Sequence, residues 1–294
     1  MEKKTLEKIG GNGYAENMTL SDRNNIFKAG IVLSVLCLAI CAAGTIKLIP
    51  AYASMEEEIA RRSGGIFQAL VGKYADAAPL SAHFCIFALV LYSFFSIIFI
   101  YYFFEKTQSP EILFMVFFAV SFSVESLRLV VPLRHIHEIP SLYLILSSRA
   151  ILFGRFFGLF SLFAASLYAV GYEAERQRNV ILVSIIVALV MALGAPVDTQ
   201  TWDSSLNMSN GFTSMFRFIE IGVLIITTVS FFIAVRQRGS REFAFIGIGS
   251  VLAFLGRSVL LYADTWAGLP AGLVFLAAGT WLICARLHKI YLWL

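Results

Sequence analysis

Residues 80–104 read LSAHFCIFALVLYSFFSIIFIYYFF and contain no Asp, Glu, Lys or Arg. An α-helix needs about 20 apolar residues to cross a hydrocarbon core that is about 30 Å thick. Because lipid offers no hydrogen-bond partners, a backbone in that environment must satisfy its own N–H and C=O groups, as a helix does. We therefore predict a transmembrane helix over 80–104.

Seven further stretches have a similar length and composition. Of the 294 residues, 59% are hydrophobic and 14% are charged, and the mean hydropathy is +0.78. These values lie outside the usual range of soluble globular domains. The expected fold class is therefore all-α, a polytopic membrane helix bundle with eight transmembrane helices. The predicted spans are 27–48, 80–104, 111–131, 144–171, 180–193, 212–235, 242–262 and 269–287.

The basic residues predict the orientation of the bundle. With eight spans both termini share one side, and Lys and Arg near span ends favour the cytoplasm. The side of the termini carries twelve of them and the opposite side four, which predicts an inner-membrane protein with both termini cytoplasmic. The twelve are Lys3, Lys4, Lys8, Arg23, Lys106, Arg176, Arg178, Arg236, Arg238, Arg241, Arg286 and Lys289, and the four are Arg61, Arg62, Lys73 and Arg134.

The chain is expected to have four segments. Residues 1–26 read as a flexible cytoplasmic tail, 27–48 as a retained anchor helix, 49–79 as an extracytoplasmic loop and 80–294 as a seven-helix membrane domain. An apolar stripe at helical spacing between Met55 and Tyr74 predicts an amphipathic helix in the loop, either a packing lid or a mobile gate. Similar turns at 104–111 and 235–242 favour a three-one-three arrangement of the seven spans.

Ionisable residues inside the spans are the main functional signal. Each costs about 2.5–3.5 kcal/mol at a helix centre on insertion scales, so they are expected to face a protein interior or a water-filled cavity. At 1.5 Å per residue, the seven Asp, Glu, Lys and Arg residues that lie more than two positions from a span end all fall toward the outer side of the predicted topology. These predicted ligand-binding residues are Arg128, Arg149, Arg155, Arg217, Arg257, Glu125 and Glu220.

Helical spacing predicts how some of these residues pair. Glu125 and Arg128 are three residues apart, as are Arg217 and Glu220, so each pair is expected to share a helix face. One interpretation is that these are structural ion pairs that fix packing. Two carboxylates cannot neutralise five guanidiniums, however, and a guanidinium suits carboxylate or phosphate. The surplus predicts a pocket for an anionic small molecule or a phospholipid headgroup.

We therefore favour a binding role in the membrane, with transport of the bound anion. In this hypothesis Arg128 and Arg257 contact the anion, Arg155 receives it deeper, and Glu125 and Glu220 orient the arginines. The seven-span layout resembles that of small three-one-three transporters and also that of bacterial seven-helix sensor domains. The second interpretation is therefore a sensor or accessory subunit with a separate cytoplasmic partner, and a homo-oligomer is left open.

His135, His137 and Glu138 form the one cluster that resembles reaction chemistry. Two histidines two residues apart face the same side of a strand-like loop, where they would bind a metal or move protons. This gives a third interpretation, an enzyme that acts on lipid headgroups. No HExxH motif, nucleophile elbow or phosphate-binding glycine loop accompanies the cluster. We therefore expect no catalytic residue, metal, cofactor or nucleic-acid partner.

Overall fold

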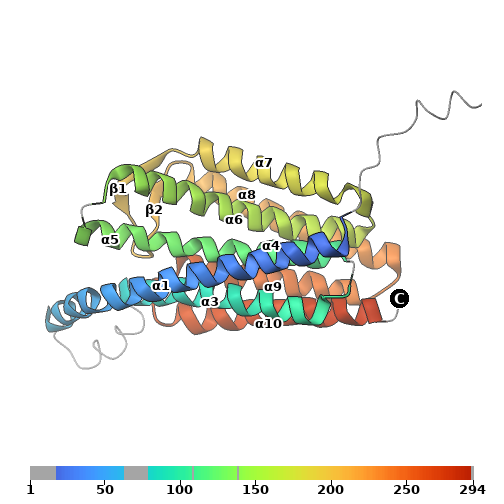
Figure 1. Cartoon of the computed structure of the whole chain (residues 1–294), viewed down its shortest axis with the longest axis horizontal. Helices are drawn as coiled ribbons and strands as arrows, with labels where there is room; N and C mark the ends of the chain where they lie inside the picture. Colours follow the sequence, from blue (N-terminus) through green and yellow to red (C-terminus); the bar gives the residue numbers. More distant parts are fainter. Residues whose placement is uncertain (1–17, 63–78, 108, 138, 293–294) are drawn as a thin grey trace, which may run out of the picture.

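The computed structural model describes residues 18–62, 79–107, 109–137 and 139–292. Figure 1 shows an elongated bundle in which the helices run roughly side by side along its length. The elements are α1 (Leu20–Arg62), α3 (Pro79–Phe104), α4 (Pro110–Ser121), η1 (Phe122–Leu129), α5 (Val130–His137), α6 (Ser141–Val170), η2 (Ala174–Arg176), α7 (Gln177–Gly194), β1 (Val197–Trp202), β2 (Met208–Asn210), α8 (Thr213–Arg238), α9 (Glu242–Tyr262) and α10 (Gly268–Leu292).

Within the described residues, eight helical segments are long and apolar enough to cross a membrane. This confirms the predicted all-α class and the multi-pass character of the chain. The eight segments include α7, which corresponds to the shortest predicted span, 180–193. The segments are Leu20–Pro50, Leu80–Phe104, Pro110–Arg134, Ser141–Val170, Gln177–Gly194, Thr213–Arg238, Glu242–Tyr262 and Gly268–Tyr291.

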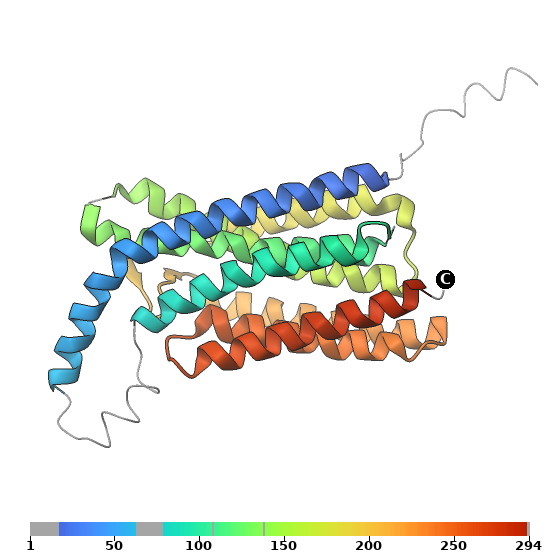
Figure 2. The ribbon, with the colours of Figure 1, turned by 60° about the horizontal axis from the view of Figure 1, so that its bottom comes forward.

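The first helix is longer than the predicted anchor at 27–48. It begins at Leu20 and continues through Pro50 to Arg62, and Figure 2 shows that α1 changes direction toward its C-terminal end. Proline causes such bends because it lacks an N–H and its ring clashes with the preceding turn. Residues 55–62 of the predicted amphipathic helix therefore belong to α1, and residues 63–78 lie outside the described part of the chain.

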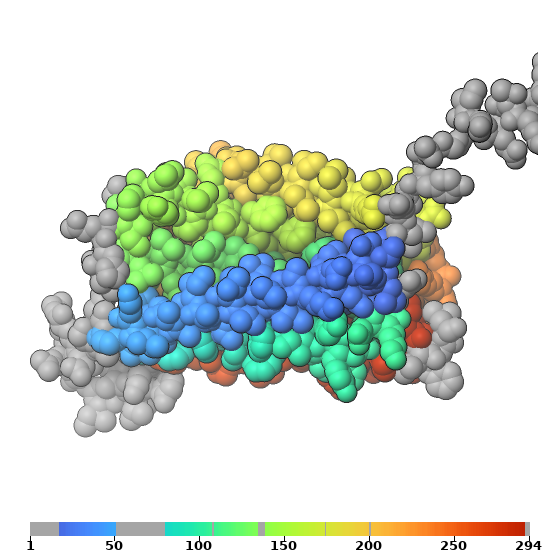
Figure 3. All heavy atoms as spheres, viewed as in Figure 1, coloured from blue at the N-terminus to red at the C-terminus, as the bar shows by residue number. Residues whose placement is uncertain are grey.

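The third and fourth spans form the centre of the bundle. In their most apolar windows 72% and 61% of the residues are buried, against 17% for α7 and 22% for α8. On one face, α1 lies across α3 and the third span, as the space-filling view shows (Figure 3). The outer helices therefore keep apolar surface for lipid, and the central spans are where polar groups can be enclosed.

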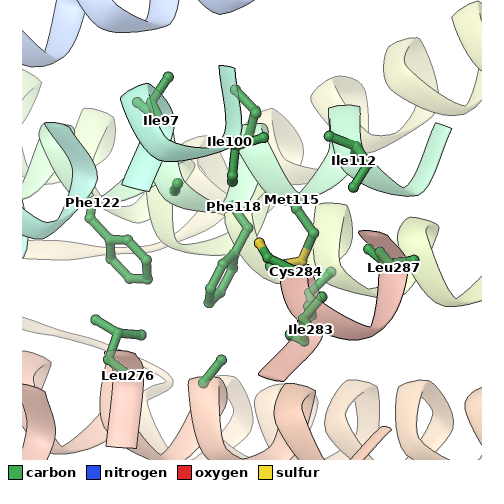
Figure 4. Packing of buried hydrophobic residues seen from close by; sticks show 14 of the residues in the cluster. Ile97, Ile100, Ile112, Met115, Phe118, Phe122, Leu276, Ile283, Cys284 and Leu287 are labelled. Atoms are coloured by element: carbon green, nitrogen blue, oxygen red, sulfur yellow. The ribbon is translucent and has the colours of Figure 1, made fainter. Parts of the chain in front are cut away.

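Apolar side chains fill the space between α3, α4 and α10 (Figure 4). The rings of Phe118 and Phe122 meet edge to face with their centroids 5.0 Å apart, a favourable geometry for aromatic pairs. Met115, Leu276 and Ile283 belong to the same buried cluster. This cluster is the main hydrophobic core.

The two ends of the bundle differ. Figure 1 shows that α1 begins and α10 ends at one end, which we call the terminal end, while β1 and β2 lie at the other, the hairpin end. At the terminal end α6 stops at Gly171 (φ 113°) and α8 at Gly239 (φ 66°), a left-handed conformation that glycine adopts without strain. These caps produce the short turns there.

The hairpin was predicted only as a loop. Strands β1 and β2 are antiparallel, with Val197 opposite Asn210 and Trp202 opposite Met208. The turn between them enters the bundle, because Leu206 is buried in an apolar cluster with Ile86 and other residues. This burial offsets the left-handed backbone of Leu206 (φ 61°), which costs a non-glycine residue about 1–2 kcal/mol.

The third span changes its winding halfway along. Between α4 and α5, the 3₁₀ segment η1 covers Phe122–Leu129. A 3₁₀ helix has three residues per turn, so the side chains at i and i+3 lie directly above each other. Glu125 and Arg128 are therefore aligned along one line of the helix. Long 3₁₀ segments are uncommon and often mark functional positions.

Candidate functional site

Five of the seven predicted site residues meet toward the hairpin end of the bundle. They come from four spans, and each is at most 8% exposed. Burial of charged groups is costly unless they are paired and hydrogen-bonded. The five residues, which we call the charge cluster, are Glu125, Arg128, Arg155, Glu220 and Arg257.

Glu125 is the centre of the first part of the charge cluster. Arg155 of α6 donates from Nε to Oε1 (2.7 Å) and from Nη2 to Oε2 (2.8 Å) of this carboxylate. Nη1 of Arg128 donates to Oε2 at 3.4 Å. The two-point contact with Arg155 is the stronger of the two, because parallel N–H···O bonds match the fork of the guanidinium to the carboxylate. Glu125 thus joins η1 to α6.

Glu220 and Arg257 form the second part of the charge cluster. Nη1 and Nη2 of Arg257 both donate to Oε1 of Glu220 at 3.3 Å, and Nη2 also donates to the carbonyl oxygen of Arg155 at 3.2 Å. This corrects the predicted pairing, since Glu220 contacts α9 whereas Arg217 is exposed on α8. In an α-helix, residues three apart differ in direction by about 60°, which is enough to separate a buried face from an exposed one.

Arg149 also lies outside the charge cluster. Its Nη1 donates to the carbonyl oxygens of Ala192 (2.9 Å) and Leu193, where the C-terminal end of α7 leaves carbonyls without helical partners. A cation is favourable at this position because the helix dipole is negative there. The charge cluster therefore contains three guanidiniums and two carboxylates, and the predicted surplus of three positive charges falls to one.

The arginines of the cluster also hold the hairpin turn. Nη2 of Arg128 donates to the carbonyl oxygen of Ser205, and Nη2 of Arg155 donates to Oδ1 of Asn207 at 2.6 Å. Nδ2 of Asn207 in turn donates to the carbonyl oxygen of Leu261 in α9 at 3.3 Å. These two acceptors, the carbonyl oxygen of Ser205 and Oδ1 of Asn207, were not predicted from the sequence because neither carries charge. The loop from 195 to 211, which has no Lys or Arg, was the only signal available.

A cavity of about 300 Å³ lies between the hairpin, α6 and α8. This volume is at the lower limit of small-molecule pockets in proteins. Several of its lining residues, such as Thr201 and Asp203, are exposed, so the cavity is open at the hairpin end. Its charged lining residues are Arg155, Asp203 and Glu220, and its aromatic lining residues are Phe156, Trp202, Phe216 and Tyr262.

Three charged atoms of the lining residues make no hydrogen bond within the described part of the chain. Arg155 donates through Nε and Nη2, so its Nη1 is the atom without a hydrogen bond. Glu220 is held through Oε1, which leaves Oε2. Asp203 accepts through Oδ1 from Ser205 Oγ (2.9 Å) and Asn207 N (2.7 Å), which leaves Oδ2. The cavity thus combines a fixed donor with two fixed acceptors.

A smaller cavity of about 10 Å³ lies beside the charge cluster. Nε of Arg128 and Oδ1 of Asn210 are buried without a partner among the described residues, and both residues line this cavity. A space of this size suits one water molecule, which would bridge the donor and the acceptor. We therefore regard it as part of the packing of Arg128.

The histidine cluster differs from its prediction. Residues 130–137 are helical, and residues two apart on a helix do not face the same side, in contrast to the strand-like loop that was expected. The side chains of His135 and His137, and residue Glu138, lie outside the described part of the structure. Among the described His, Cys, Asp and Glu residues, no group of three is placed to hold a metal ion.

No protein-family model matches the sequence, and comparison with curated proteins and with solved structures finds no significant match. The function is therefore inferred from the geometry of the cavity and the charge cluster.

Proposed function

We propose that this chain is an integral membrane protein that binds a small molecule or lipid headgroup with an anionic group in the cavity at the hairpin end. The observation that carries the proposal is the position of Arg155. It is buried, its Nε and Nη2 are fixed by Glu125 and Asn207, and its Nη1 has no partner among the described residues beside an open cavity. A guanidinium held in this way is a preorganised donor for carboxylate or phosphate.

The other arginines have different roles in this proposal. Arg128 and Arg257 do not line the cavity, although the sequence favoured them as the contacts for the anion. Arg257 holds Glu220 and the backbone of Arg155, and Arg128 shares Glu125 with Arg155. Both are therefore positioning residues, and Arg155 is the residue that contacts the ligand.

We also propose that the chain lies in the inner membrane with its hairpin end outside the cytoplasm. The loop from 195 to 211 and the segment from 263 to 268 contain no Lys or Arg, whereas Arg236 and Arg238 lie in the last turn of α8 at the terminal end and Arg241 follows it. Basic residues are retained on the cytoplasmic side during insertion. In this orientation the ligand enters from outside the cytoplasm.

Transport is the form of this function that the sequence favoured. The apolar core between α3, α4 and α10 (Figure 4) fills the bundle in this conformation, so transport requires the helices to rearrange around the charge cluster. The same packed core supports the second candidate, a sensor or accessory subunit. In that case the ligand stays in the cavity and its binding is transmitted through the helices to a cytoplasmic partner.

Binding is tested with the purified protein in nanodiscs. sn-Glycerol 3-phosphate and phosphatidylglycerol are the anionic probes, followed by calorimetry and native mass spectrometry respectively. We expect Arg155→Gln to weaken binding about 10- to 100-fold, the effect of losing a charge-assisted hydrogen bond. The matched control is Arg217→Gln, which removes an exposed arginine and should change nothing. Folded Arg155→Gln protein with unchanged affinity, or no binding of either probe by the natural sequence, would contradict the proposal.

Measuring the uptake of the ligand distinguishes a transporter from a sensor. Uptake of labelled sn-glycerol 3-phosphate by proteoliposomes that contain only this chain would support transport. Binding without uptake, together with a cytoplasmic protein that co-purifies only when the probe is present, would support the sensor.

A further inference from the structure

We propose that the ligand of this cavity is zwitterionic, with a phosphate or carboxylate at Arg155 and an ammonium group at Glu220 and Asp203. This inference rests on the proposed function and deepens it. The sequence predicted an anionic ligand because the spans contain five arginines and only two glutamates at the predicted site. In the structure, only some of these residues lie near the cavity, and Asp203 is added to them.

The charges around the cavity are balanced. The lining contributes one guanidinium, of Arg155, and two carboxylates, of Asp203 and Glu220. Behind it lie Arg128, Arg257 and Glu125, so three cations meet three anions. A purely anionic ligand would place an uncompensated negative charge beside two carboxylates, and like charges held side by side repel each other. A zwitterion preserves the balance and gives each end an opposite partner.

Two carboxylate oxygens are available for the cationic end. Oε2 of Glu220 and Oδ2 of Asp203 make no hydrogen bond within the described residues, while the other oxygen of each carboxylate is held in place. Arg257 fixes Glu220, and the hydroxyl of Ser205 and the backbone N–H of Asn207 fix Asp203. Both acceptors are thus positioned before a ligand arrives, which lowers the entropy lost on binding.

Aromatic rings complete the site for a cation. Phe156 and Phe216 meet edge to face, with ring centroids 5.2 Å apart and an interplanar angle of 70°. Trp202 and Tyr262 are the other aromatic residues of the lining. Ammonium groups are attracted to aromatic faces, and carboxylates beside such rings add a direct charge partner. A site that holds only an anion does not need this combination.

The source of the zwitterion is either a free small molecule or the headgroup of a lipid. Both share the same chemistry, an ammonium group a few bonds away from a phosphate or carboxylate. Phe212, directly before α8, and Met215 and Phe218 on α8 are exposed close to the lining residues Thr213 and Phe216. This apolar surface is where the acyl chains of a lipid would lie if its headgroup entered the cavity.

The test compares two probes that differ at one end. O-Phosphoethanolamine and sn-glycerol 3-phosphate share a phosphate ester, but only the first has an ammonium group. We expect O-phosphoethanolamine to bind the protein in nanodiscs about tenfold more tightly by calorimetry, as expected for one ammonium recognised by a carboxylate and rings. For the lipid source, the matched pair is phosphatidylethanolamine against phosphatidylglycerol, followed by native mass spectrometry.

Asp203→Asn is the decisive variant. Asparagine keeps Oδ1 for Ser205 and Asn207, and it replaces the negatively charged acceptor Oδ2 by an uncharged amide donor. It should weaken binding of O-phosphoethanolamine about tenfold and leave sn-glycerol 3-phosphate equal or tighter. Asp198→Asn is the matched control, because Asp198 lies on the same hairpin, accepts from Thr201 Oγ1 (2.7 Å) and does not line the cavity.

Each outcome has one interpretation. Equal affinity for the two probes of each pair, with no effect of Asp203→Asn, overturns the zwitterion inference and leaves the binding of an anion intact. Tighter binding of phosphatidylethanolamine than of phosphatidylglycerol, with the difference lost in Asp203→Asn, supports the inference with a lipid as the source. Failure of all four probes overturns the inference together with the proposed function.

Discussion

Arg155 and Glu125 form a two-point ion pair between α6 and η1, and their side chains are only 9% and 2% exposed. The energy of removing two charges from water offsets much of the attraction in a buried pair, so such pairs add little net stability. They are nevertheless specific, because both bonds require one relative rotation of the two helices. We infer that this pair sets how the third and fourth spans face each other.

Substitution Glu125→Gln should be among the most destabilising single changes in the chain. It leaves Arg155 and Arg128 buried without their carboxylate, and breaking a buried pair from one side costs about 3–5 kcal/mol. Thermal unfolding in one detergent measures the effect. The control is Glu242→Gln, which removes the contacts with Arg286 (3.0 Å) and Lys289 (2.5 Å) at the partly exposed terminal end. It should cost at most about 1 kcal/mol, and similar losses for both variants would contradict the prediction.

Asn207→Ala should loosen the hairpin and spare the rest of the bundle. It removes the acceptor of Arg155 Nη2 and the donor to Leu261, and such buried bonds contribute about 1–3 kcal/mol. We expect amide exchange at 203–210 to become about tenfold faster or more, with no change in α3. Thr201→Ala is the control, because among the described residues the only side-chain bond it loses is the one to Asp198. Exchange that rises equally in α3 would show that the whole bundle had loosened.

Gly279→Val should separate α9 from α10. A Cβ atom at position 279 would lie 2.6 Å from the backbone oxygen of Gly249, so the helices must move apart. Small residues allow this close packing in membranes, and overpacking of this kind costs about 1–3 kcal/mol. Gly222→Ala is the control, because nothing lies within 4 Å of its added Cβ. Equal melting temperatures for the two variants would exclude such close packing.

Cysteine labelling tests the proposed orientation. The four natural cysteines are poor targets, since Cys41, Cys85 and Cys284 are buried and Cys37 is partly buried. We expect Thr201→Cys to react with a membrane-impermeant maleimide in intact cells. Arg236→Cys should react only after the membrane is permeabilised. The reverse result would place the hairpin end in the cytoplasm.

Residue spacing predicted the spans well, because length and hydropathy are properties of a single segment. Each of the eight predicted spans corresponds to one candidate span of the structure. The contact between Glu125 and Arg128 was also predicted, and the 3₁₀ winding of η1 aligns these two residues more closely than an α-helix would. Local sequence therefore indicates neighbours within one helix.

Contacts between helices were not predictable in the same way. Whether Glu220 meets Arg217 or Arg257 depends on how α8 is rotated against α9, and that rotation is set by the packing of many apolar side chains. The carbonyl and amide oxygens of the hairpin turn were missed for a second reason. Neutral acceptors in a loop carry no periodic pattern, so the partners of Arg128 and Arg155 became visible only in the folded chain.

The pairing of Glu220 with Arg257 limits which substitutions these two positions can accept during evolution. A substitution that removes one of the two charges leaves the other buried and unpaired, so a lineage can change these positions only together or through a neutral pair. Among homologous chains, positions 220 and 257 should therefore covary. Position 217, where the arginine is exposed and lies apart from that pair, is not subject to this constraint.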